Sequence, residues 1–134
     1  MIILKNKQEV LDIIKGKKVL DLTGIFIFSN KDFLENFEIA ITYVDYVSLE
    51  PFSFLVIVED DLIKKAIILP EIYIGVYDDK RVYRNPDEII LKNKKFLIDK
   101  EFVFIGGESL TADIEKELIS GVHGPAEVFA YRMI

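Results

Sequence analysis

Continuous apolar runs alternate along the chain with segments in which apolar residues have helical spacing. Runs rich in β-branched and aromatic residues predict buried strands, and apolar residues three or four apart behind a capping side chain predict helices. The predicted strands cover residues 19–28, 39–47, 52–58, 72–77 and 102–105, and a last apolar run covers 128–134. The predicted helices cover residues 6–15, 31–37, 62–69 and 86–92, and one more lies between Ser109 and Ser120. This order predicts a three-layer α/β fold, in which a mostly parallel sheet is flanked by helices.

Length and composition indicate one folded domain. The chain has 134 residues, of which 51% are hydrophobic and 30% charged, a mixture typical of globular proteins. The net charge of −6 argues against a nucleic-acid surface, which is normally basic. No cysteine is present, so the chain alone holds no disulfide and no cysteine-ligated iron–sulfur cluster. Many isoleucines, lysines and glutamates favour a thermophilic source.

The first residues and the longest apolar runs indicate where in the cell the protein is expected. Lys5, Lys7 and Glu9 follow Met1 too closely for a secretory signal. No uncharged run approaches the roughly 20 residues that a membrane helix needs. We therefore expect a cytoplasmic protein that does not enter a membrane.

The strand at 102–105 leads into a segment rich in site-forming residue types. They are Gly106, Gly107, Ser109, Thr111, Asp113 and Glu115. Either hydroxyl residue can cap the next helix, and a glycine loop before a helix N-terminus can bind an anion. Neither G-x-x-x-x-G-K nor G-x-G-x-x-G occurs, however, and the carboxylates would repel an anion. Spacing alone therefore favours an ordinary capped turn over a phosphate site.

The only histidine, His123, stands in the turn G-V-H-G-P beside Gly124. An imidazole titrates near neutral pH, so His123 could serve as a general acid or base. A structural hydrogen-bonding role is the alternative. No second histidine or cysteine could complete a soft-metal site with it.

A run of three acids, Glu59-Asp60-Asp61, follows the strand at 52–58. Carboxylates after a strand could hold Mg²⁺. The favoured interpretation is that they stabilise the positive N-terminal end of the next helix.

Two motifs near the C-terminus resemble a known family. The motif T-A-D-I-E, followed after a helical spacer by G-V-H-G-P, resembles the closing signature of the lactate-utilization (LUD) domain family, formerly DUF162. The resemblance extends over roughly residues 39–134, with Asp45 and Glu50 at the family's two acidic positions and Ile68-Leu69-Pro70 at its Leu-Leu-Pro. Pro51-Phe52-Ser53 stands where the family has Thr-Gly-Thr, and the N-terminal region is shorter than that of a full member.

This resemblance implies a fold akin to that of sugar-phosphate isomerases and coenzyme-A transferases. It also implies a role in the oxidation of lactate or related organic acids beside iron–sulfur proteins. Open α/β sheets bind ligands at the carboxyl ends of parallel strands, and we expect the loop after Ile105 to be such a place. The predicted catalytic residues are Glu50, Asp113, Glu115 and His123, and the predicted ligand-binding residues are Gly106, Gly107, Ser109, Thr111 and Gly124.

The leading hypothesis is a LUD-like protein that binds a small organic acid or a phosphorylated metabolite. A non-catalytic scaffold or regulatory subunit of an iron–sulfur oxidoreductase is one alternative, favoured by Phe52 at the glycine position. An isomerase or coenzyme-A transferase relative is another, with Glu50 as the candidate nucleophile. The sequence does not indicate a cofactor. It also leaves open whether the chain forms a homo-oligomer.

Overall fold

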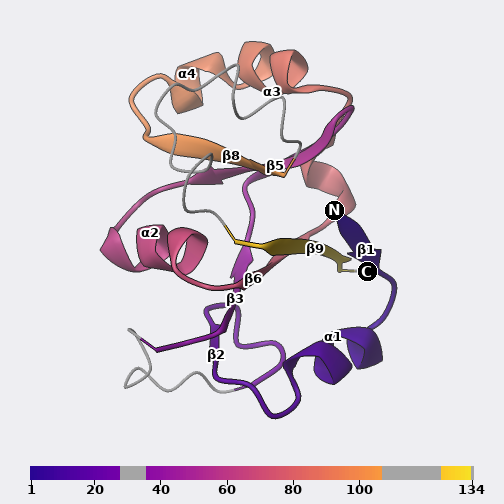
Figure 1. Cartoon of the computed structure of the whole chain (residues 1–134). Coiled ribbons are helices and arrows are strands. Elements are labelled where there is room, and N and C mark those ends of the chain that lie inside the picture. Colours follow the sequence, from indigo (N-terminus) through magenta and orange to yellow (C-terminus); the bar gives the residue numbers. More distant parts are fainter. Residues whose placement is uncertain (28–35, 107–124, 134) are drawn as a thin grey trace.

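Two β-sheets pack face to face, and helices cover the outer face of each (Figure 1). The computed structural model describes residues 1–27, 36–106 and 125–133. The predicted α/β class with a mostly parallel sheet flanked by helices is confirmed. A second sheet adds to the predicted architecture.

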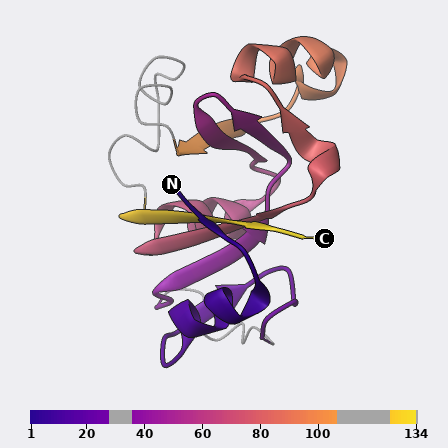
Figure 2. The same cartoon turned by 90° about the vertical axis from the view of Figure 1, so that its right-hand side faces the viewer.

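The first sheet is entirely parallel, with the strand order β1-β9-β6-β3-β2. Its strands are β1 (Ile2–Leu4), β2 (Val19–Asp21), β3 (Ile39–Tyr43), β6 (Ile72–Tyr77) and β9 (Glu127–Arg132). Figure 2 shows these strands nearly edge-on below the second sheet. The central strand, β6, has the predicted bounds, because an apolar run buried on both faces is a strong strand signal.

The second sheet has the order β7-β4-β5-β8. Its strands are β4 (Tyr46–Leu49), β5 (Phe52–Ile57), β7 (Val82–Tyr83) and β8 (Phe102–Gly106). Strand β5 is antiparallel to both of its neighbours, and β7 is parallel to β4.

The prediction of one strand over residues 39–47 is wrong, because the chain changes sheets there. The Val44 N–H donates to the Val76 carbonyl of the first sheet, and the Asp45 N–H donates to the Leu55 carbonyl of the second. Strands β3 and β4 therefore belong to different sheets, with Val44 and Asp45 crossing between them.

Capping side chains set the starts of three helices close to their predicted positions. These are α1 (Lys7–Ile14), α2 (Asp61–Ile68) and α3 (Pro86–Lys92). The caps Asn6, Asp60 and Asn85 each accept a hydrogen bond from the backbone N–H three residues on, at 2.8–3.0 Å. Asp60 and Asp61 of the run Glu59-Asp60-Asp61 therefore lie at the N-terminus of α2, where the favoured interpretation placed them.

Two shorter helices complete the described part of the chain. They are the 3₁₀ helix η2 (Asp79–Arg81), which precedes α3, and α4 (Lys94–Leu97), which comes after it. Of the predicted helix at 31–37, residues 31–35 lie outside the described residues, and residues 36 and 37 are not helical. The helix predicted between Ser109 and Ser120 also lies outside the described residues. Within the described part of the chain, no helix is long and apolar enough to cross a membrane.

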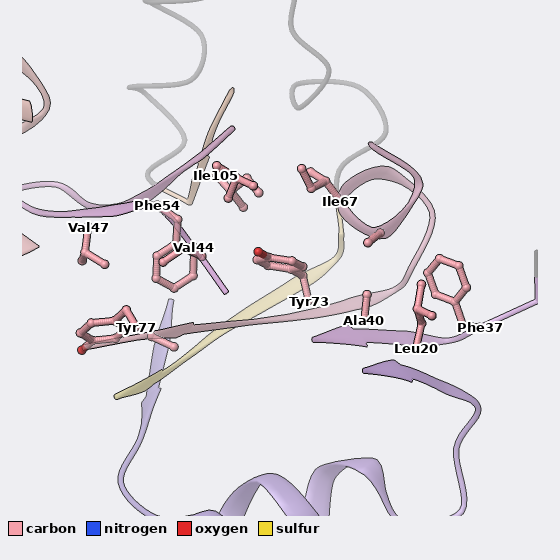
Figure 3. Close-up of a cluster of buried hydrophobic side chains, with 13 residues drawn as sticks. Leu20, Phe37, Ala40, Val44, Val47, Phe54, Ile67, Tyr73, Tyr77 and Ile105 are labelled. Carbon is pink, nitrogen blue, oxygen red and sulfur yellow. The ribbon is translucent and has the colours of Figure 1, made fainter. Parts of the chain in front are cut away.

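Three apolar clusters hold these layers together. Helix α1 covers the outer face of the first sheet, where Val10 and Ile14 join Ile39, Ile41, Ile74 and Val76. Between the sheets, Leu20, Ala40, Tyr73 and Ala130 meet Val47, Phe54, Val56 and Ile105, with α2 alongside (Figure 3). Helices α3 and α4 cover the outer face of the second sheet through Ile89 and Leu97.

Thr42 and Tyr73 form a hydrogen-bonded polar pair in the core between the sheets. The Tyr73 hydroxyl lies 2.5 Å from Thr42 Oγ1, and Thr42 Oγ1 donates to the Tyr43 carbonyl at 3.0 Å. Because Thr42 has one proton to give, Tyr73 donates to Thr42. Burial raises the pKa of the Tyr73 phenol well above its ordinary range, so Tyr73 stays neutral in the core.

Candidate functional site

Glu50 and Gly106 lie at the same end of the second sheet. Glu50 occupies the turn between β4 and β5, where its side chain is exposed and its N–H donates to the Arg84 carbonyl at 2.9 Å. Gly106 ends β8 opposite Ser53, the second residue of β5. The register of β5 therefore places these two predicted site residues near each other.

Gly106 has a structural reason to be glycine. Its φ of 104° lies in a region that other residues rarely adopt. A Cβ atom on Gly106 would also lie 3.1 Å from the Phe52 carbonyl oxygen and 3.3 Å from Ser53 Cα. Strand packing alone thus accounts for this glycine, and its ligand-binding role stays a prediction.

The other predicted site residues lie outside the described residues. They are Gly107, Ser109, Thr111, Asp113, Glu115, His123 and Gly124. The expectation that the loop after Ile105 follows a parallel strand is wrong, because β8 belongs to the second sheet and runs antiparallel to β5. In sequence, this segment joins β8 of the second sheet to β9 of the first.

Phe52, which stands at the resembled family's glycine position, packs into the core between the sheets. Its ring centroid lies 6.2 Å from that of Phe54 and 6.4 Å from that of Tyr77, both in edge-to-face geometry. This ring is half-buried against the same cluster as Tyr73. Phe52 therefore contributes to the contact between the sheets.

The two acidic positions of the resemblance lie at opposite ends of β4. Asp45 precedes β4 and follows β3, so it stands at the carboxyl edge of the parallel sheet, whereas Glu50 follows β4. Ligands of open α/β folds bind at this edge. Asp45 is half-buried, and its Oδ2 accepts from the Ile57 N–H at 2.7 Å.

The surroundings of Asp45 change its acidity. Burial raises the pKa of the Asp45 carboxyl, and the nearby Glu59 raises it further. The Ile57 N–H and the Arg81 guanidinium lower it, but burial is the largest effect and the pKa is raised overall. Asp45 is therefore easier to protonate than an exposed aspartate.

Arg81 adds a cation to this edge. It ends η2, its Nη1 lies 3.5 Å from the Asp45 carbonyl oxygen, and its guanidinium lies 5.9 Å from the Tyr46 ring centroid. Tyr46 in turn meets Tyr83 edge-to-face at 5.7 Å. A guanidinium held over an aromatic ring is well suited to bind carboxylate or phosphate oxygens. Sequence reasoning found Asp45 only through the resemblance and missed Arg81.

Asp21 shapes a loop at the same edge. Its buried carboxylate accepts from the N–H and hydroxyl of Thr23 and from the N–H of Gly24 through Oδ1, and from the N–H groups of Phe26 and Ile27 through Oδ2. Of the β-rich stretch predicted over 19–28, only Val19–Asp21 is a strand among the described residues, because the amides of the following loop bond to the Asp21 side chain. The sequence D-L-T-G carries the signal of such a turn.

The described acids do not form a metal centre. Within residues 1–27, 36–106 and 125–133, no three His, Cys, Asp or Glu side chains gather closely enough to hold a metal ion. Asp60, which the Mg²⁺ alternative would need, caps α2 at 2.9 Å from the Ile63 nitrogen.

The Asp45 carboxyl should make stability depend on pH. Its pKa in the folded protein is raised above the ordinary value of 3.8, so the folded state binds this proton more tightly than the unfolded state does. The folded state therefore loses stability as the pH rises from the ordinary pKa through the raised pKa. Asp45→Asn keeps an acceptor for the Ile57 N–H without the charge. Denaturant unfolding should therefore show the variant gaining stability over the natural chain at about pH 7 but not at about pH 3. Equal differences at both values would contradict the raised pKa.

Comparisons with known proteins bear on this fold. No protein-family model matches the chain, and no curated protein matches it. The structure is similar to the crystal structure of a DUF162 family protein from Deinococcus radiodurans, with a TM-score of 0.70 and 12% sequence identity. The match covers 98% of this chain and 87% of that one. DUF162 is the LUD domain family, so the fold implied by the sequence motifs is confirmed.

Proposed function

We propose that this chain is a LUD-like protein that binds a small organic acid or a phosphorylated metabolite and takes part in the oxidation of lactate or related acids. The observation that carries the proposal is the fold likeness to a DUF162 family protein over 98% of the chain. It agrees with the order of T-A-D-I-E and G-V-H-G-P in the sequence. These two similarities rest on different properties of the chain, its backbone course and its motif residues.

The proposed ligand contacts come from the segment after β8 and from Glu50, which lies at the same end of the second sheet as Gly106. In this proposal Glu50 or His123 transfers protons, while Ser109 and Thr111 orient ligand oxygens. Asp113 and Glu115 complete the polar surface, and Gly106, Gly107 and Gly124 leave room for the ligand. Asp45 and Arg81, at the opposite end of β4, offer an alternative place for an organic acid, with a half-buried carboxyl and an exposed guanidinium.

In this proposal, a partner protein that holds iron–sulfur clusters carries out the electron transfer. The chain has no cysteine to ligate an iron–sulfur cluster, so electrons from an organic acid would pass to a separate iron–sulfur subunit. We place this assembly in the cytoplasm.

A second candidate is a non-catalytic scaffold or regulatory subunit of such a complex. The observation that favours it is the pair Phe52 and Glu50: the Phe52 ring fills core space between the sheets, and Glu50 lies exposed on a turn. A coenzyme-A transferase relative would instead need Glu50 as a nucleophile held beside its substrate.

The test is calorimetric titration of the full chain with L-lactate and with ribose 5-phosphate, in the natural sequence and in His123→Ala and Asp113→Ala. Loss of one charge-assisted hydrogen bond should weaken binding about 10-fold or more in each variant. Thermal unfolding of both variants should stay close to that of the natural chain. Glu71→Gln, which changes an exposed acid preceding β6, is the matched control and should bind as the natural chain does.

Unchanged binding in both variants would reject the site assignment. If neither ligand binds the natural chain, the small-molecule function is rejected and the subunit interpretation is favoured. Binding that depends on Asp45 and Arg81 but not on His123 would place the ligand at the edge of the parallel sheet alone.

A further inference from the structure

Two buried serines bond to the turn between β4 and β5. Ser48 and Ser53 lie opposite each other on these strands, and both residues are fully buried. The Ser48 hydroxyl donates to the Pro51 carbonyl oxygen at 2.9 Å, and the Ser53 hydroxyl donates to the same oxygen at 3.3 Å. A carbonyl oxygen has two lone pairs, so it can accept both bonds. The turn is therefore closed by side chains as well as by the backbone of the two strands.

The pairing of β4 with β5 does not need these hydroxyls. Antiparallel strands pair through backbone N–H and C=O groups, which almost every residue type provides. The neighbouring positions, Val47 and Phe54, are apolar and equally buried, and burial of a hydroxyl is unfavourable unless it finds a partner. Because both serines find their partner in the turn, we ascribe the two hydroxyls to the geometry of the turn.

This turn carries Glu50 and adjoins Gly106. Glu50 is exposed, and its N–H donates to the Arg84 carbonyl at 2.9 Å, which fixes the backbone of the turn on its other side. Ser53 pairs with Gly106 of β8, and its Cα lies 3.3 Å from the place of a Cβ on that glycine. Ser53 therefore connects the two parts of the candidate site, through its hydroxyl to the turn and through its backbone to Gly106.

We propose that Ser48 and Ser53 are positioning residues, which hold the turn so that Glu50 stays in one place beside Gly106. Both serines are fully buried, so they act on a ligand only through the turn. Groups that bind a ligand need hydrogen bonds behind them that fix their position. The inference rests on the proposed function, because it takes Glu50 as a residue of the ligand site.

The first experiment measures amide hydrogen exchange in Ser48→Ala and Ser53→Ala. Each change removes one hydrogen bond to the turn, so exchange at the Glu50 N–H should become about 5-fold faster or more. The matched control is Thr42→Val, which removes a buried hydroxyl from the first sheet. The control should lower overall stability to a similar extent and leave exchange at Glu50 unchanged. Ser53→Thr keeps the hydroxyl and should exchange as the natural chain does.

The second experiment titrates the same variants with L-lactate and with ribose 5-phosphate. The ligand that binds the natural chain should bind about 10-fold more weakly to Ser48→Ala, to Ser53→Ala and to Glu50→Gln. Adding Ser48→Ala to Glu50→Gln should weaken binding no further, because the serine acts through the Glu50 carboxylate. Thr42→Val should bind as the natural chain does.

Three results would overturn the proposal. Exchange at Glu50 could be the same in both serine variants as in the natural chain, or Thr42→Val could accelerate it equally. In the titrations, the losses from Ser48→Ala and Glu50→Gln could add, which would show that the serine acts apart from Glu50. Absence of binding to the natural chain would reject the proposed function, whereas the exchange rates decide by themselves whether the serines hold the turn.

Discussion

Phe54→Ala is expected to lower the free energy of unfolding by about 3–5 kcal/mol, the range for truncating a buried aromatic side chain. The side chain is fully buried, and its ring lies 6.2 Å from Phe52 and 6.3 Å from both Tyr73 and Tyr77 between the centroids. The variant loses part of the contact between the two sheets and leaves a cavity that the surrounding side chains fill only in part. Urea or guanidinium unfolding measures the loss.

Gly75 supplies the control for this contact. A Cβ atom on Gly75 would lie 2.8 Å from two carbons of the Phe54 ring, closer than real Cβ atoms approach such neighbours. Gly75→Ala should therefore destabilise the natural chain by about 1–3 kcal/mol through overpacking. In the Phe54→Ala background the same change should cost almost nothing, because the ring is gone. Equal costs in both backgrounds would contradict the packing of Phe54 on β6.

Asp21→Ala is expected to lower the free energy of unfolding by about 2–4 kcal/mol, because it leaves several loop donors without their acceptor. The N–H groups of Thr23, Gly24, Phe26 and Ile27 all bond to this carboxylate, which is itself 3% exposed. Unfolding by denaturant measures the total loss. Hydrogen exchange should show faster exchange at those four amides.

Asp78→Ala is the matched control. Asp78 is a half-buried cap of η2 that accepts from the Lys80 N–H at 2.9 Å, and loss of such a cap costs about 1 kcal/mol. Similar losses for the two variants, or unchanged exchange in the loop after β2, would show that Asp21 does not organise that loop.

Local interactions explain which parts of the fold could be predicted from the sequence. Helices α1, α2 and α3 begin where Asn6, Asp60 and Asn85 bond to amides three residues on, a contact that sequence spacing reveals. Strand β6 is apolar enough to be recognised by itself. The second sheet was not predicted, because it depends on distant pairings such as Val47 with Val82. Apolar residues resume at Tyr46 and Val47 directly after Asp45, so the pattern alone does not mark the change of sheet.

The same distinction applies to the candidate site. Glu50 and Gly106 come together through the pairing of β5 with both β4 and β8, which neither motif encodes. Arg81 reaches Asp45 across 36 positions of sequence, so no spacing rule could find it. Asp21 was visible in D-L-T-G as a turn residue, but its burial follows from the sheet around it. The predicted roles of His123 and the residues from 107 to 124 rest on motif resemblance and stay predictions.

The most direct test of the proposed site is an amide NMR titration of the isotope-labelled full chain with L-lactate and with ribose 5-phosphate. Our account predicts that one of these ligands causes saturable shifts at the amides of Gly106, Gly107, Ser109, Thr111, His123 and Gly124. The absence of saturable shifts with both ligands, or shifts confined to residues far from these two segments, would contradict it.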